Sequence, residues 1–379
     1  MSEITLNDLE TPCLLLDREL LEVNAARMLA VAVHHEIRLR PHVKTSKCAE
    51  IADIMTGGLR SRITVSTLEE ATTFARAGFT DMLYAVGVSV GKFPRIAELI
   101  NGVGADLTLI TDSVDVAKAA VAFTDANDVT FRFLIEFDCG EHRGGLDVDD
   151  PDAVEIARIL ADGERTELRG VMTHAGHSYA TNDLAEIQKI SATEVAVAVK
   201  AAETIRRQGI DIDVVSIGST PTVIFGKDFN GVTELRAGIY AFYDLSQWSR
   251  KVCRREDIAL SVLATVIGHN KPGKAIVVDA GALALSKDLG ANTFMPGTAY
   301  GPVCNPETLN QYEDLVVEIV HQEHGTIPIP DDYWFERLPV GAKVRILPNH
   351  ACLTAAAHTS YTLIQEGYIM GQWERSNGW

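Results

Sequence analysis

The sequence contains no long apolar run and no recognisable N-terminal signal. No apolar run approaches the roughly 20 residues that a membrane-spanning helix needs, and the N-terminal residues MSEITLNDLETP have no basic region followed by an apolar one. We therefore expect a cytoplasmic protein that has no membrane partner.

Basic residues are also scarce, and the cysteines are not paired. The formal net charge is −18, which argues against nucleic acid as the main partner but leaves a small anionic substrate open, because local cations matter more than the total charge. No CxxC pair occurs, so the cysteines are expected to be free thiols, one of which could bind a metal. They are Cys13, Cys48, Cys139, Cys253, Cys304 and Cys352.

Short apolar runs alternate with amphipathic segments from about residue 36 to residue 240. This alternation predicts parallel strands joined by crossover helices, and eight units match a (β/α)8 TIM barrel, which we place at residues 18–245. The seventh helix, around Pro221–Phe229, should be short. The predicted strands are Arg38–Val43, Ile63–Ser66, Met82–Val86, Leu107–Ile110, Phe131–Phe137, Leu168–Thr173, Val214–Ile217 and Thr233–Arg236.

The pattern changes after Asp244, where strand-like runs follow one another with turn signals such as Lys271-Pro-Gly between them. No convincing helix separates these runs. We predict a mostly antiparallel C-terminal β domain at residues 246–379, which residues 1–17 complete because the run Cys13–Asp17 could pair with it.

Lys44 is the first candidate for chemistry. It lies at the end of the first predicted strand, and strand alternation places Arg40, His42 and Lys44 on one face. Neighbouring cations would favour the neutral, nucleophilic amine that a bond to an aldehyde cofactor requires. The alternative is an ordinary solvated lysine, for which nearby Lys47 provides the comparison.

Two glycine-containing turns follow the last two barrel strands, where barrels commonly bind phosphate. Gly218-Ser219-Thr220 contains hydroxyls and backbone N–H groups, and the next strand ends in Arg236-Ala-Gly238-Ile239. Each turn alone is weak, but together they favour a phosphate site.

His350 and Cys352 could bind one divalent metal. In an extended chain, residues two apart point the same way, and a nitrogen and a sulfur ligand suit zinc best, with manganese or cobalt as alternatives. A buried thiol beside a turn histidine is the commoner meaning of such a pair.

Several motifs together resemble the fold-type III pyridoxal-phosphate (PLP) enzymes of alanine racemase-like fold, in the branch of metal-dependent D-serine dehydratases and D-threonine aldolases. The resemblance covers nearly the whole chain. It rests on Arg40-Pro-His-Val-Lys44-Thr, Thr173-His-Ala-Gly-His-Ser-Tyr179, Gly218-Ser-Thr220, Thr233-Glu-Leu-Arg236-Ala-Gly238 and Pro348-Asn-His350-Ala-Cys352.

The resemblance implies a role for each matched residue. Lys44 matches the lysine that forms a Schiff base with PLP, and His350 and Cys352 match the metal ligands of the dehydratases. Arg143, in Gly140-Glu-His-Arg143-Gly, would meet the phenolic oxygen of PLP, and Arg236 its pyridine nitrogen. The phosphate would be bound by Gly238 and Ile239, with Ser219, Thr220 and Tyr179 nearby.

The implied activity is elimination of water from a D-3-hydroxy amino acid, such as D-threo-3-hydroxyaspartate or D-serine, to a 2-oxo acid and ammonia. Aldolases of the family tend to carry aspartate where Cys352 stands, so the cysteine favours a dehydratase. A D-threonine-type aldolase remains the main alternative, followed by a racemase and a non-catalytic PLP carrier. A homodimer is expected, because fold relatives are dimers. A side-chain carboxylate on the substrate would need a further cation or donor, for which His42, His174, His177 and Arg40 are candidates.

Overall fold

The computed structural model describes residues 5–379, which form two compact units. One unit comprises residues 25–238 and 376–379, and the other comprises residues 5–24 and 239–375. Among the described helices, none combines the length and the apolar composition that crossing a membrane demands.

The first unit is built on an eight-stranded parallel sheet in the order β2-β9-β8-β7-β6-β5-β4-β3. A parallel bridge between His42 and Thr64 joins the two ends of this order. The sheet therefore curls into a barrel, which confirms the predicted (β/α)8 fold. Its strands are β2 (Arg38–Leu39), β3 (Ile63–Val65), β4 (Asp81–Tyr84), β5 (Asp106–Thr111), β6 (Phe131–Phe137), β7 (Thr166–Thr173), β8 (Val214–Ile217) and β9 (Glu234–Leu235).

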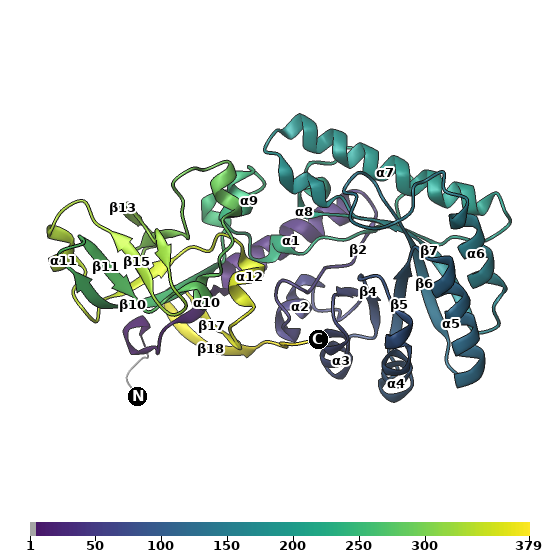
Figure 1. Cartoon of the computed structure of the whole chain (residues 1–379), viewed down its shortest axis with the longest axis horizontal. Helices are drawn as coiled ribbons and strands as arrows, with labels where there is room; N and C mark the ends of the chain where they lie inside the picture. Colours follow the sequence, from purple (N-terminus) through teal and green to yellow (C-terminus); the bar gives the residue numbers. More distant parts are fainter. Residues whose placement is uncertain (1–4) are drawn as a thin grey trace. The chain divides into compact units, whose positions relative to one another are not determined.

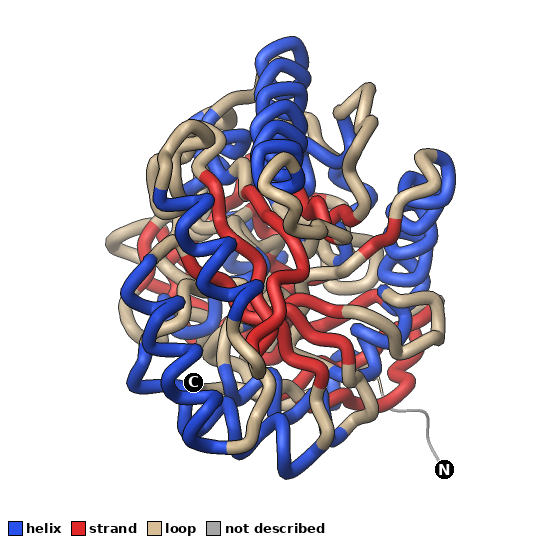
Figure 2. The backbone as a smooth tube through the Cα atoms, turned by 90° about the vertical axis from the view of Figure 1, so that its right-hand side faces the viewer, coloured by secondary structure: helices blue, strands red, loops and turns tan. Residues whose placement is uncertain are grey.

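Helices cover the outside of these strands (Figures 1 and 2). Several begin at a side chain that caps the first turn: Thr67 accepts a hydrogen bond from Glu70 N, and Asp183 accepts one from Ala185 N. The seventh helix of the barrel, α8, is short, as predicted. The helices are α1 (Arg18–His34), which the two units share, α2 (Ala49–Met55), α3 (Leu68–Arg76), α4 (Phe93–Val103), α5 (Val114–Asn127), α6 (Asp152–Asp162), α7 (Leu184–Arg206) and α8 (Thr220–Phe225).

The first barrel strand is shorter than predicted. It ends at Leu39 rather than Val43, because Pro41 has no N–H group to continue the ladder. Backbone bonds from Arg40 N to Leu235 O and from His42 N to Ala237 O still hold the chain against β9 and the turn after it. Lys44 therefore follows an irregular extension of the strand.

The second unit is a sheet of mainly antiparallel strands, as predicted, with the path β13-β12-β16-β10-β1-β17-β18 and with β11, β15 and β14 beside it. Cys13–Asp17 lies between β10 and β17, antiparallel to the first and parallel to the second. The strands are β1 (Cys13–Asp17), β10 (Leu260–Asn270), β11 (Ala275–Val278), β12 (Pro302–Cys304), β13 (Gln311–Val316), β14 (Ile319–Val320), β15 (Gly325–Pro328), β16 (Lys343–Ile346), β17 (Ser360–Gln365) and β18 (Tyr368–Glu374).

The prediction that no helices separate these strands was wrong. Each of the four α-helices in this part of the chain has only four or five residues, too few for helical periodicity to show in the sequence. They are α9 (Leu245–Ser249), α10 (Ala282–Leu285), α11 (Tyr333–Arg337) and α12 (Ala351–Ala355).

Candidate active site

A cavity of about 460 Å³ lies at the carboxyl ends of the barrel strands. Lys44 follows β2, Asp112 follows β5 and His174 follows β7. This is the edge where barrel enzymes place their catalytic groups. The cavity is lined by His42, Lys44, Ser66, Ala85, Val86, Gly87, Ile110, Asp112, Glu136, Arg143, Gly144, Met172, His174 and Arg236.

Lys44 and Lys47 differ in whether the side-chain amine already has an ionic partner. Lys44 is exposed and lines the cavity, and within residues 5–379 its amine makes no ion pair. Lys47 Nζ lies 3.1 Å from the buried Glu70 Oε1. The Lys44 amine is therefore open to a ligand, whereas the Lys47 amine is already engaged.

Two histidines beside Lys44 are kept neutral. Burial, with Lys44 and Arg236 nearby, lowers the pKa of His174 to about 3. Burial and the nearby charges of Lys44, His174 and Arg236 also hold the pKa of His42 well below its usual range. His174 Nδ1 donates to Gly218 O at 2.7 Å, so its Nε2 carries no proton and can accept one.

Arg236 is buried, and hydrogen bonds hold its guanidinium in place. Its Nη1 donates to Ser216 Oγ at 2.7 Å, and its Nη2 donates to Thr173 O. Ser216 Oγ in turn donates to Glu234 Oε1 at 2.8 Å. The guanidinium therefore reaches the cavity in a fixed orientation.

Arg40 does not join His42 and Lys44 at the cavity, so the prediction of a shared face fails for this residue. Its Nε lies 2.7 Å from Glu234 Oε2 and its Nη1 lies 2.7 Å from Asp81 Oδ1. A buried carboxylate such as Glu234 is costly without a cation. Arg40 serves that carboxylate and is not free to bind a substrate.

The turn after β8 brings Gly218, Ser219 and Thr220 together. Gly218 has φ +147°, and a Cβ there would lie 1.9 Å from Arg236 O, so only glycine fits. Ser219 Oγ accepts from Thr222 N at 3.3 Å and caps α8, while Thr220 N donates to Tyr179 Oη at 3.3 Å. Thr220 Oγ1 is buried and has no hydrogen-bond partner among the described residues, which fits contact with a ligand oxygen.

The other predicted cofactor contacts are placed as follows. Arg143 lines the cavity and is largely exposed, with Nη1 3.5 Å from Glu141 Oε1 and Nη2 4.0 Å from Glu136 Oε1. Gly238 packs so closely that a Cβ would lie 2.6 Å from His42 O. Ile239 is buried and begins the other unit.

His350 and Cys352 lie in the second unit, and the extended geometry predicted for them was wrong. His350 is extended, with φ −139° and ψ 103°, but it is the residue from which α12 starts, and Cys352 lies in the first turn of that helix. The thiol nevertheless forms a hydrogen bond with the imidazole. The two donor atoms are therefore adjacent, as a shared metal requires.

Two aspartates support this pair. Asp288 Oδ2 lies 2.8 Å from His350 Nδ1. Asp244 is fully buried and accepts hydrogen bonds from Gln247 N at 2.8 Å and from Ala351 N at 2.9 Å, which fixes the start of α12. Burial disfavours the charged imidazole, but the hydrogen bonds with Asp288 and Cys352 outweigh it and raise the pKa of His350 to about 11.

The donor set fits zinc, which accepts imidazole nitrogen and thiolate sulfur. Within residues 5–379, no group of three or more His, Cys, Asp or Glu side chains is arranged to bind a metal. His350 and Cys352 can thus supply two ligands, and a bound metal would complete its coordination with water or substrate.

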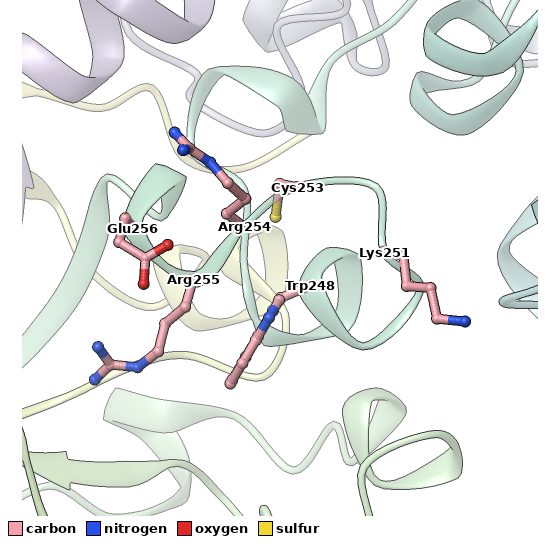
Figure 3. A pocket seen from close by; sticks show the side chains of 6 residues that line it. All are labelled: Trp248, Lys251, Cys253, Arg254, Arg255 and Glu256. Atoms are coloured by element: carbon pink, nitrogen blue, oxygen red, sulfur yellow. The ribbon is translucent and has the colours of Figure 1, made fainter.

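A second hollow of about 440 Å³ lies in the second unit (Figure 3). The charged ends of Lys251, Arg254 and Arg255 point in different directions there. Arg254 Nη2 is bonded to Asp257 Oδ1, and Arg255 Nη2 donates to Leu309 O. The hollow therefore lacks the convergent polar groups of a reaction site.

Sequence reasoning missed five carboxylates: Asp112 and Glu136 in the cavity, Asp244 and Asp288 near the His350–Cys352 pair, and Glu194 on α7. Glu194 alone had a readable signal, because it interrupts the apolar stripe of its helix, in which Ile187, Ile190 and Ala198 are buried. Asp288 is far from His350 in the sequence, and nothing local marks it.

Comparison with known proteins identifies the family. Residues 16–246 match the family described as alanine racemase, N-terminal domain, and residues 259–364 match a serine dehydratase domain. The chain is 41% identical to D-threo-3-hydroxyaspartate dehydratase from Delftia sp. (strain HT23), over 99% of both chains. It is 30% identical to D-serine dehydratase from Dictyostelium discoideum, over 99% of this chain and 98% of that one.

The chain belongs to the family that joins these two domains. The solved structure of D-threo-3-hydroxyaspartate dehydratase from Delftia sp. HT23 superposes on this member of the family with a TM-score of 0.95 at 41% identity, covering 99% of this chain and 100% of that one. Two further structures of a D-threo-3-hydroxyaspartate dehydratase carry alanine in place of a histidine or a cysteine, and the cysteine variant is in the metal-free form. The fold class and the family resemblance predicted from the sequence are thereby confirmed.

Proposed function

We propose that this chain is a PLP- and metal-dependent lyase that eliminates water from a D-3-hydroxy amino acid to give a 2-oxo acid and ammonia. The observation that carries the proposal is the full-length, 41% identical match to a D-threo-3-hydroxyaspartate dehydratase, combined with a cavity that contains an unengaged lysine. Lys44 is the residue that would bind the cofactor covalently.

The polar groups of the cavity suit PLP. Lys44 would bond to its aldehyde carbon, Arg236 would face the pyridine nitrogen and Arg143 the phenolic oxygen. The Thr220 hydroxyl, which has no hydrogen-bond partner among the described residues, would contact the phosphate. When bound, PLP would withdraw electrons from the substrate and acidify its α-proton.

Lys44 Nζ would take the α-proton, since it is the one lysine among the cavity-lining residues. His42 and His174 are neutral, so they do not supply the neighbouring positive charge that the sequence predicted beside this amine, but they leave it room among uncharged rings. Arg236, held by Ser216 and Thr173, would keep the pyridine nitrogen unprotonated. These residues together prepare the substrate for loss of the 3-hydroxyl.

The leaving group is where a metal would act. Hydroxide leaves poorly, and a zinc ion on His350 and Cys352 would supply Lewis acidity to the 3-hydroxyl. Asp288 would orient the His350 ring through its hydrogen bond to Nδ1.

Product analysis tests this proposal. The holoenzyme is incubated with D-serine, D-threonine and both D-3-hydroxyaspartate diastereomers, and ammonia and 2-oxo acid are quantified. Equimolar ammonia and 2-oxo acid from at least one substrate is the expected result. The proposal would be contradicted if none of these substrates released ammonia.

A second function, aldol cleavage, is favoured by relatives with 26–27% identity that include a D-threonine aldolase from Arthrobacter sp. and a 3-hydroxy-D-aspartate aldolase from Paracoccus denitrificans. The same incubations separate the two, because an aldolase would release glycine and an aldehyde instead of ammonia.

A further inference from the structure

A carboxylate lies in the apolar stripe of α7. The inward-facing residues of this helix are mainly alanine and isoleucine, but Glu194 shares that face and has no exposed surface. A charged group buried in this way is costly unless donors satisfy it. The contacts of Glu194 therefore indicate what it does.

Glu194 accepts hydrogen bonds from two different loops. Its Oε1 accepts from Ala175 N at 3.1 Å, after β7, and from Gly218 N at 2.9 Å, after β8. Its Oε2 accepts from Thr222 Oγ1 at 2.8 Å, in α8. One carboxylate thus joins the ends of two adjacent barrel strands at the edge where the cavity lies.

These bonds continue to the groups that face the cavity. The backbone of Gly218 is held on both sides, because its N–H donates to Glu194 and its carbonyl accepts from His174 Nδ1 at 2.7 Å. Thr222 Oγ1 also accepts from Ser219 N at 3.1 Å, which closes the turn around Thr220. Moving Glu194 would shift both the His174 ring and the Thr220 hydroxyl.

The backbone N–H groups of the turn formed by residues 218–220, the proposed phosphate-binding turn, already have partners. The N–H of Gly218 is used by Glu194, that of Ser219 by Thr222, and that of Thr220 by Tyr179. The Thr220 hydroxyl is the buried group of this turn that has no partner among the described residues. Its position depends on the bonds that Glu194 makes.

We propose that Glu194 is a positioning residue for cofactor binding: by fixing Gly218, Thr222 and Ala175, it sets the phosphate-binding turn and the His174 ring in register. This inference rests on the proposed PLP-dependent function. A positioning role can be told from general packing, because the Thr220 hydroxyl would contact the phosphate of the cofactor. The aldehyde and the ring would instead contact Lys44, Arg236 and Arg143.

The test compares PLP with pyridoxal, which lacks the phosphate. The cofactor is removed from wild type and Glu194→Gln, and dissociation constants for both ligands are measured by absorbance titration. Glutamine has the shape of glutamate, but one of its two side-chain oxygens is replaced by an NH2 group. That group cannot accept the hydrogen bonds that the replaced carboxylate oxygen accepts. We expect PLP binding to weaken about tenfold or more, the scale on which charge-assisted hydrogen bonds act, and pyridoxal binding to change little.

Ser191→Ala is the matched control. Ser191 is buried on the same helix and donates to Thr222 O at 3.0 Å, but it bonds neither Gly218 nor Ala175. Thr222→Val removes the Oε2 contact and the bond from Ser219 N to Thr222 Oγ1 but leaves both Oε1 contacts. It provides a second variant and should also show a loss that is selective for PLP.

Equal weakening for PLP and pyridoxal, the same loss in Ser191→Ala, or an unchanged PLP affinity in both Glu194→Gln and Thr222→Val would overturn the assignment. If Glu194→Gln does not fold, Thr222→Val decides alone. Wild type that binds no PLP would instead count against the proposed function, so the two failures are distinguishable.

Discussion

Replacing Asp288 with asparagine should weaken metal binding without removing a proposed ligand. Asp288 Oδ2 accepts from His350 Nδ1 at 2.8 Å, which leaves Nε2 for the metal and fixes the ring. Loss of such a partner typically weakens metal affinity 10- to 100-fold, about 1.4–2.7 kcal/mol. The Asp288 side chain is 24% exposed and that of His350 is 36% exposed, so solvent screens the pair and we expect the lower end, about tenfold.

Competition against a chromophoric chelator measures the zinc affinity of wild type and of Asp288→Asn directly. Asp314→Asn makes the same charge change at an exposed position on β13 and should leave the affinity unchanged. An affinity for Asp288→Asn within about twofold of wild type would refute the reasoning, given the tenfold scale on which such partners act. An equal loss in Asp314→Asn would show that net charge, not ring orientation, is responsible.

The remaining predictions concern the metal pair and His174. Cys352→Asp replaces a soft ligand with a hard one, so zinc affinity and elimination should both fall; unchanged elimination activity would mean that the cysteine does not distinguish dehydratase from aldolase. Chelation should abolish activity on a 3-hydroxy substrate but spare a 3-chloro substrate, whose leaving group needs no Lewis acid, and an equal loss on both would contradict the role of the metal. Because burial lowers the pKa of His174 from 6.5 to about 3, the unfolded chain binds a proton that the folded chain excludes, and the free energy of unfolding falls as pH drops from 6.5 toward 3. Urea unfolding of His174→Gln should show a weaker pH dependence in this window, by up to about 1.4 kcal/mol per pH unit, and slopes identical to wild type would count against the assignment.

The barrel could be predicted because its strands are buried on both faces. In Phe131–Phe137, for example, five of the seven residues are apolar and buried. Amphipathic helices lie between such strands, and this pattern is visible in the sequence. The short helices of the second unit could not be predicted, since they depend on tertiary contacts such as the bond from Ala351 N to Asp244. The same contacts place Cys352 in a helix where the sequence suggested an extended chain.

At the site, sequence position was enough to place Lys44, His174 and Arg236 around one cavity, because the ends of parallel strands meet at one edge of the barrel. The direction of Arg40 could not be predicted, because it is set by the buried Glu234 carboxylate on the neighbouring strand β9, 194 residues later in the chain. Asp288 was out of reach for a similar reason, as its partner lies far along the chain.

The central claim is that Lys44 binds the cofactor. It is tested most directly by reducing the holoenzyme with borohydride, digesting it and locating the pyridoxyl group by mass spectrometry. We predict that the pyridoxyl group is found on the side chain of Lys44 and is absent from Lys47, whose amine pairs with Glu70. A label on Lys47 or on any other lysine, or no label at all, would contradict the account.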